Sequence, residues 1–316
     1  MKAKNKIITA ILLSSATAAG TALINKYIKM TAISKNFLFV QEPHCYKWRL
    51  GNIHYTKIGN GKPLLLIHDL ESISSGCEWE NLISQLKDQY TIYTIDLLGC
   101  GRSEKPNLTY TNFLYVQLIN DFIKSEIGHR TNVITSGSSS SLVTMTCGYN
   151  PDLFEKIMFI NPESFTSCSQ IPGKSAKFYK LILDMPILGT LLYHTGVARN
   201  IIENTFKEKY FYNLYDVKQS YIDKYFEAAH LGDSPKAIYS SVLCNYTKCN
   251  ISRSLEKINN SIYILCGAAE PKADHVIKEY TLCNPSIEFS TIPNTKHLPQ
   301  LEKPTEVSNI ITMFFN

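Results

Sequence analysis

Three stretches of the sequence place residues that could act as nucleophile, base and acid after apolar runs. The first is Asn132–Ser136, which leads into a run of Gly and Ser and then into a helical pattern. A sharp strand-to-helix turn needs small residues two before and two after its apex, because the chain there approaches neighbouring backbone closely. This spacing puts Ser139 at the apex, with Gly137 and Ser141 as the small residues. A serine there would stand at a helix N-terminus, where an oxyanion is stabilised. A serine run before a helix is also typical of an N-cap.

The other two stretches follow the last two strand-like runs. His297 lies in a loop after the final run, where a histidine would face the carboxyl edge of a parallel sheet and could serve as a general base. Glu270 follows Cys266 at the end of the run before it, in a position to set the tautomer of a histidine. Ser139, Glu270 and His297 together therefore predict nucleophilic catalysis with a Ser-His-Glu triad.

The elements that must position these residues alternate between buried strand and helix patterns. This alternation predicts an α/β fold with a mostly parallel, doubly wound sheet and right-handed crossovers. Helices are expected at Glu78–Asp88, Thr111–Gly128 and Ser140–Gly148. Strands are expected at Tyr46–Gly51, Ile53–Ile58, Pro63–His68, Thr91–Asp96, Asn132–Ser136, Ile157–Asn161, Ile262–Cys266 and Ile287–Ile292.

The alternation stops near Glu163 for about ninety residues that are helical in pattern. The better helical segments are Phe178–Leu183, Gly196–Phe206 and Tyr221–His230. An insertion at the carboxyl edge of a parallel sheet lies over the crevice where such folds bind ligands. We therefore expect a helical cap, and its alternative is an unrelated second domain. The resulting division is a core in two parts, 42–162 and 256–316, and a cap at 163–255.

The first thirty residues form a separate N-terminal hydrophobic helix in the prediction. The formal charge of the chain is +5, and residues 1–30 carry five lysines and no acid, so the rest is neutral. A neutral folded part excludes a basic nucleic-acid-binding surface. The uncharged run Ile7–Asn25 predicts an uncleaved membrane anchor through residues 7–25. Two alternatives are a signal peptide, with secretion after cleavage, and a helix lying on the protein itself. The side of the membrane and the oligomeric state stay open.

The nine cysteines indicate neither a metal site nor a disulfide framework. They are scattered, odd in number and contain no pair at zinc-finger spacing, so separate reduced thiols are expected. The sequence predicts no metal and no cofactor.

With these motifs in place, the chain resembles the α/β-hydrolase family of the capped, serine-nucleophile kind. The resemblance covers about residues 46–162 and 256–316 and is most specific at Asp96–Pro106 and at Thr295–Pro304. It implies a serine hydrolase that cleaves an ester or a related acyl or C–C bond of a small molecule through an acyl-enzyme. Dehalogenases and epoxide hydrolases resemble the chain in layout, but carry a carboxylate at the apex and form an alkyl ester.

Departures from the family pattern motivate an alternative function. The family has Gly where this chain has Ser141, and His-Gly where it has His68-Asp69. The resemblance implies an oxyanion hole made by the amides of Leu70 or Asp69 and of Ser140. A carboxylate beside an oxyanion opposes catalysis unless it points away or is paired. The alternative is thus a weakly active or inactive binding or sensor protein with this fold.

Some candidate roles remain open within the resemblance. Glu163 follows the expected strand Ile157–Asn161 and is the alternative acid, because some family members place the acid after this strand. His230 and the tyrosines around 209–214 are candidates for substrate contacts in the cap.

Overall fold

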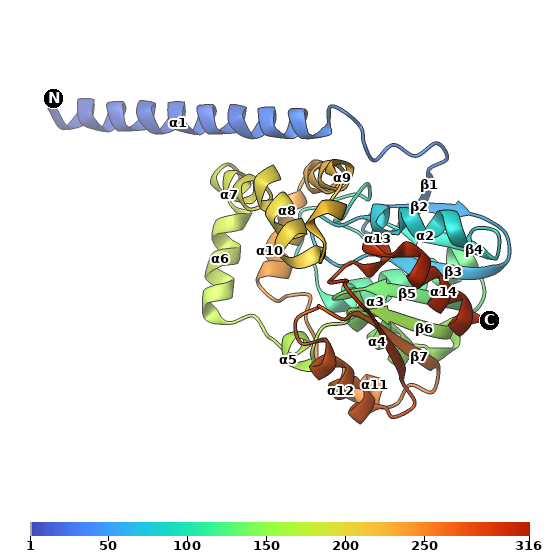
Figure 1. The fold of residues 1–316 in the computed structure, drawn as a ribbon. Helices are drawn as coiled ribbons and strands as arrows, with labels where there is room; N and C mark the ends of the chain where they lie inside the picture. Colours follow the sequence, from blue (N-terminus) through green and yellow to red (C-terminus); the bar gives the residue numbers. More distant parts are fainter. Residues whose placement is uncertain (1) are drawn as a thin grey trace.

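An eight-stranded sheet forms the centre of the computed structural model, which describes the backbone of residues 2–316 and the side chains of residues 17–316 (Figure 1). The strand order is β1-β2-β4-β3-β5-β6-β7-β8; β1 and β2 pair antiparallel, as do β2 and β4, and the other pairs are parallel. The predicted doubly wound α/β fold is confirmed. The strands are β1 His44–Trp48, β2 Gly51–Ile58, β3 Lys62–Ile67, β4 Tyr90–Ile95, β5 Thr131–Ser136, β6 Phe154–Ile160, β7 Ser261–Gly267 and β8 Glu288–Ile292.

Helices cover both faces of the sheet because alternate residues of its central strands point to opposite sides. Leu65 and Val133 belong to one apolar cluster, whereas Leu66 and Ile134 belong to the other. The first cluster is covered by α3 (Asn112–Phe122), α4 (Ser139–Tyr149), α11 (Ser252–Leu255) and α12 (Ala273–Cys283). The second is covered by α2 (Glu80–Leu86) and α14 (Pro304–Phe315). Burial on both faces explains the continuous apolar runs in the sequence.

Helices between β6 and β7 form the predicted cap beside the carboxyl ends of the strands (Figure 1). They are α5 (Phe165–Cys168), α6 (Lys174–Asp184), α7 (Leu188–Gly196), α8 (Arg199–Thr205), α9 (Gln219–His230) and α10 (Pro235–Leu243). The helix expected over Gly196–Phe206 starts at Arg199, because the chain breaks between α7 and α8. The cap has its own aromatic core, which includes Tyr193, Phe206, Tyr221 and Tyr225.

The N-terminal helix α1 (Lys2–Ile33) contacts the cap near its C-terminal end. Asn25 Nδ2 donates to Ile187 O at 3.1 Å, and the carboxylate of Glu227 accepts the backbone N–H of Phe37. Within the part of the chain that the structure describes, no single helix is long and apolar enough to cross a membrane. The expected anchor at 7–25 begins among side chains 1–16, which lie outside the described residues, so it stays a prediction.

A buried carboxylate holds the loop that follows β4. Asp96 is fully buried and accepts the N–H of Gly76 at 2.7 Å, the N–H of Arg102 at 2.8 Å and Arg102 Nε at 2.7 Å. Gly101 has φ +50°, and a Cβ there would lie 2.5 Å from Asp96 Oδ2, so only glycine fits. Burial alone would raise the pKa of Asp96, but the charge and hydrogen bonds of Arg102 outweigh it and hold the pKa far below its usual range.

We expect Asp96→Asn to lower the free energy of unfolding by about 3–5 kcal/mol, because it leaves Arg102 without its buried partner. The folded-state pKa of Asp96 is depressed, so its stabilisation is present above the unfolded value of about 3.9 and is lost as the pH falls through the folded value. Urea unfolding across pH measures both effects. The exposed Asp88→Asn is the matched control and should change stability little.

Candidate active site

The site lies where four parallel strands end at one edge of the sheet. Asp69 follows β3, Gly137 follows β5, Glu270 follows β7 and His297 lies in the loop after β8. The neighbouring order of β3, β5, β6, β7 and β8 brings these loops together. The fold therefore assembles residues separated by more than two hundred positions in the sequence.

The apex of the strand-to-helix turn after β5 is Gly137, and the prediction that Ser139 stands there is wrong for the geometry. Gly137 has φ +55°, a conformation that glycine adopts without steric cost. Ser139 is instead the first residue of α4, and its buried Oγ donates to His68 O at 2.6 Å. The turn comes two residues earlier than expected because a run of four serines satisfies the small-residue pattern in several registers, whereas Gly137 adopts the positive φ of the apex without steric cost.

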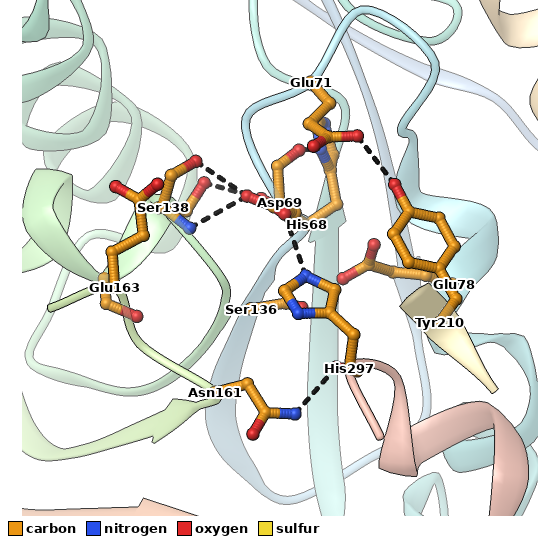
Figure 2. Close-up of polar contacts among 12 residues, drawn as sticks. His68, Asp69, Glu71, Glu78, Ser136, Ser138, Asn161, Glu163, Tyr210 and His297 are labelled. Atoms are coloured by element: carbon orange, nitrogen blue, oxygen red, sulfur yellow. Dashed lines mark hydrogen bonds and ion pairs between the residues drawn. The ribbon is translucent and has the colours of Figure 1, made fainter. Parts of the chain in front are cut away.

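The carboxylate of Asp69 fills the space into which a side chain at the apex would project. A Cβ built on Gly137 would lie 2.4 Å from both Cγ and Oδ2 of Asp69. Oδ1 accepts the backbone N–H of Ser138 at 2.8 Å and its hydroxyl at 2.7 Å, as Figure 2 shows. Burial would raise the pKa of Asp69, but hydrogen bonds from His297 and Ser138 outweigh it and lower the pKa. Asp69 is therefore an anion held where the apex side chain of the turn would stand.

His297 lies between two carboxylates. Its Nε2 is 3.2 Å from Asp69 Oδ2, and its Nδ1 is 3.5 Å from Glu270 Oε1. Burial would lower the pKa of His297, but hydrogen bonds with Asp69 and Glu270 and their charges raise it well above its usual value. The ring also stacks on Tyr210 of the cap, with 5.4 Å between centroids. The two carboxylates thus favour the protonated form of His297 in the resting site.

The remaining predicted site residues differ in their placement. Glu163 is ion-paired with Lys248, so the structure brings Glu270 and not Glu163 to His297. The N–H of Ser140 donates to Gly137 O at 3.2 Å inside the turn, so the predicted oxyanion amide is already used there. Because the apex is Gly137, the amide directly after the apex is that of Ser138. This amide donates to Asp69 Oδ1.

Two side chains fix the loops that carry Asp69 and His297. His68 Nε2 accepts the N–H of Leu97 at 3.0 Å, which leaves Nδ1 to donate to Asp69 O at 2.7 Å. Asn161 Nδ2 donates to Lys296 O at 2.9 Å and to His297 O at 2.8 Å, as Figure 2 shows for His297. The loops that carry Asp69 and His297 are therefore held by hydrogen bonds to their backbone, in addition to the contacts of the two side chains.

Two further acids lie close to the Asp69–His297 pair. Glu71 accepts the hydroxyl of Tyr210 at 2.6 Å, and burial together with the charge of Asp69 raises its pKa. Glu78 is fully buried, and burial and the charge of Asp69 raise its pKa to about 8. Glu78 is thus mostly protonated at neutral pH, which limits the negative charge around the site.

A cavity of about 340 Å³ opens beside Asp69 and His297. Its walls include Asp69, Leu70, Ser138, Tyr210 and His297, and Lys248 and Glu163 also face it. Ser139 is not among its lining residues, and neither is His230, which stacks on His194 inside the cap. The cavity size suits a small organic molecule.

Five residues of the site were not predicted as such from the sequence: Gly137, Ser138, Glu71, Glu78 and Lys248. A usable signal existed for the first, because Gly137 is the glycine in the turn and the apex requires positive φ. The others carry no local signal: their roles arise from contacts between distant segments.

Comparisons with known proteins agree with this architecture. The model of the alpha/beta hydrolase family matches residues 64–310. A 2-hydroxy-6-oxo-6-(2'-aminophenyl)hexa-2,4-dienoic acid hydrolase of Metapseudomonas resinovorans is 35% identical over 72 residues, covering 22% of this chain and 25% of that protein. A soluble epoxide hydrolase of Corynebacterium sp. (strain C12) is 30% identical over 110 residues, covering 34% and 37%. The alignments thus span a quarter to somewhat over a third of these relatives.

Solved structures show the same fold at low sequence identity. A serine hydrolase involved in carbazole degradation (CarC) aligns with a TM-score of 0.71 at 14% identity, covering 87% of this chain and 98% of that one. The carboxylesterase CesB of Bacillus subtilis aligns with a TM-score of 0.69 at 15% identity, covering 94% and 98%. The family match spans most of the chain, and the chain belongs to the alpha/beta hydrolase family.

Proposed function

We propose that this protein is a hydrolase that uses the carboxylate of Asp69 as its nucleophile, with His297 as base and Glu270 as the residue that orients it. The observation that carries the proposal is the exchange between two loops: Gly137 lacks a side chain at the apex, and the carboxylate of Asp69 occupies the vacated space. Oδ1 lies on the amide of Ser138, and Oδ2 faces His297. Family members with a carboxylate nucleophile carry it on the apex residue itself, whereas here it comes from the loop after β3.

The first step of the proposed reaction is a displacement at carbon. Oδ2 of Asp69 attacks an electrophilic carbon, the bond to the leaving group breaks, and an alkyl ester of Asp69 forms. A leaving oxygen takes up one proton from solvent. Esterification removes the negative charge of Asp69, so the pKa of His297 falls and Nε2 releases its proton. The imidazole therefore becomes a base only after the ester has formed.

The second step is hydrolysis of that ester. His297 Nε2 takes a proton from water, whose oxygen attacks the Cγ carbon of Asp69. The developing oxyanion on Oδ1 is stabilised by the N–H of Ser138, which already holds that atom in the resting site. The bond between Cγ and the alkyl oxygen breaks, the product alcohol takes the proton from His297, and Asp69 is restored.

A carboxylate nucleophile favours substrates with a strained or activated C–O or C–halogen bond over ordinary acyl esters. A small epoxide is the substrate class that we propose. The partial identity to the Corynebacterium soluble epoxide hydrolase supports this choice. The cavity of about 340 Å³ accommodates such a molecule, and its walls include Tyr210 from the cap.

A second candidate function is a non-catalytic binding or sensor protein. One observation favours it: Asp69 already satisfies the Ser138 amide and the Nε2 edge of His297. A third candidate, the acyl-enzyme on Ser139 that the sequence suggested, would need the buried Oγ to leave His68 O and reach the cavity. The following experiments separate these functions.

Asp69→Asn should abolish turnover of a small epoxide such as styrene oxide while the protein stays folded. In the wild type, a single turnover in H₂¹⁸O should place the heavy oxygen in the peptide that contains Asp69, as detected by mass spectrometry. In His297→Gln, the first step should proceed and the ester should accumulate as a mass increase on the same peptide.

Ser139→Ala is the matched control and should retain most turnover. Fluorophosphonate labelling of Ser139 would instead favour the acyl-enzyme. Absence of both label and ester across epoxides, haloalkanes and p-nitrophenyl esters would favour the binding protein.

Placing a serine at position 137 and removing the side chain of Asp69 should create a serine site. Gly137→Ser alone should lower the free energy of unfolding by about 1–3 kcal/mol, because its Cβ overlaps the Asp69 carboxylate. The double change Gly137→Ser with Asp69→Gly should recover the part of this loss that the overlap causes, and should gain p-nitrophenyl ester hydrolysis. Urea unfolding and ester assays check both, and equal damage in the single and double variants would contradict the exchange.

The pKa of His297 should depend on both flanking carboxylates. Because burial lowers the pKa of His297 while its hydrogen bonds to Asp69 and Glu270 raise it, Asp69→Asn and Glu270→Gln should each lower this pKa. The stability from this raised pKa is present below the unfolded value of about 6.5 and is lost as the pH rises through the folded value. NMR titration of His297 measures the shift.

Glu163→Gln is the control for this titration, because Glu163 pairs with Lys248 and not with His297. A larger effect of Glu163→Gln than of Glu270→Gln would transfer the orienting role to Glu163.

A further inference from the structure

The cap helix α6 buries Lys180 together with Leu183 and exposes large apolar side chains on its outer side. A surface helix buries its apolar stripe and exposes its charges. In α6, Lys180 is only 8% exposed, and its ammonium group contacts Asp184 and Ser240 Oγ at 2.9 and 3.1 Å. By contrast, Phe178 and Leu181 are 61% and 65% exposed. The outward stripe is therefore apolar, and continues into Met185 after the helix.

The outward stripe of α6 adjoins the place where α1 leaves the body of the protein. Asn25 of α1 donates to Ile187 O at the corner between α6 and α7, so this corner touches the helix. On the N-terminal side of Asn25, Leu23 and Ile24 are 69% and 53% exposed. Figure 1 shows that α1 projects past α7 and that α6 runs crosswise to α1 at the same end of the molecule.

The length and charge of α1 match those of a helix that enters a lipid bilayer. From Lys2 to Ile24 the helix rises about 35 Å at about 1.5 Å per residue, which is comparable with a hydrocarbon core of about 30 Å. Residues 7–25 carry no charge, and the lysines on both sides of them are not accompanied by any acid before Glu42. Lys174 and Lys177 add positive charge to the exposed surface of α6.

We propose that α6 is a membrane-docking helix that lies in the headgroup region of an anionic lipid bilayer, with α1 entering the same bilayer. The crosswise arrangement lets one helix follow the bilayer normal while the other lies along the surface. Phe178 and Leu181 face the acyl chains, and Lys174 and Lys177 reach anionic headgroups. The buried Lys180 keeps α6 attached to α10 through Ser240 while its apolar side faces outward. This inference does not depend on the proposed chemistry of Asp69.

The test measures binding of the full chain to vesicles of phosphatidylcholine mixed with phosphatidylglycerol, and to phosphatidylcholine alone. The double variant Phe178→Ser/Leu181→Ser should lower partitioning about tenfold, because it removes the apolar stripe and leaves α1 intact. The control Leu282→Ser/Met313→Ser changes two residues that are 73% and 64% exposed on α12 and α14, and should partition as the wild type does. Binding should be stronger to the anionic mixture and should weaken with salt.

Hydrogen exchange of the segment 174–185 provides a second measurement that does not depend on a variant. Its amides should exchange more slowly on anionic vesicles than in solution, while those of α12 should not change. Equal partitioning of the two double variants, or unchanged exchange in α6, would overturn the proposal. If the α6 variant instead abolished a dimer seen by sedimentation velocity without lipid, the stripe would be an interface with a second copy and the proposal would be wrong.

Discussion

The hydrogen bond between Asp69 and the amide of Ser138 is the contact on which the arrangement of the site depends. It holds a buried carboxylate at the mouth of the turn after β5, and that carboxylate in turn sets the position and charge of His297. An isolated buried carboxylate is costly, so its pairing on both oxygens is what makes it tolerable. The ion pair between Asp69 and His297 contributes both to the lowered pKa of Asp69 and to the raised pKa of His297.

Two residues that are distant in the sequence make this contact possible together. Asp69 would have no room if residue 137 had a side chain, and without Asp69 the glycine would leave the apex empty. The backbone of the Asp69 loop is fixed by His68, whose tautomer is set by the N–H of Leu97. Changes at either residue are therefore expected to be strongly non-additive. In the proposed mechanism, the nucleophile therefore comes from the loop after β3 and not from the apex after β5.

The cap meets two different demands. Its inner side contributes Tyr210, which stacks on His297 and donates to Glu71, so cap and core are joined at the site. Its outer side at α6 exposes an apolar stripe next to the projecting α1. A lysine on the inner side of α6 is acceptable only because Asp184 and Ser240 bind it.

Much of the fold could be read from the sequence because its signals are local. Apolar runs such as Pro63–His68 are buried on both faces of the sheet, and their alternation with helical patterns predicted a mostly parallel, doubly wound sheet with an inserted cap. The positions of Glu270 and His297 after β7 and β8 were also predictable, since strand ends of a parallel sheet share one edge.

The identity of the apex residue was decided only by the tertiary structure. A run of four serines fits the small-residue pattern in several registers, and the local sequence cannot tell which residue turns the corner. The register is set by the pairing of β5 with β3 and β6, which carries the strand to Ser136 and leaves Gly137 to adopt positive φ. The sequence by itself determined which residue types reach the edge of the sheet. Only folding decided that Asp69, and not Ser139, faces His297, because that choice depends on contacts between segments that are far apart in the chain.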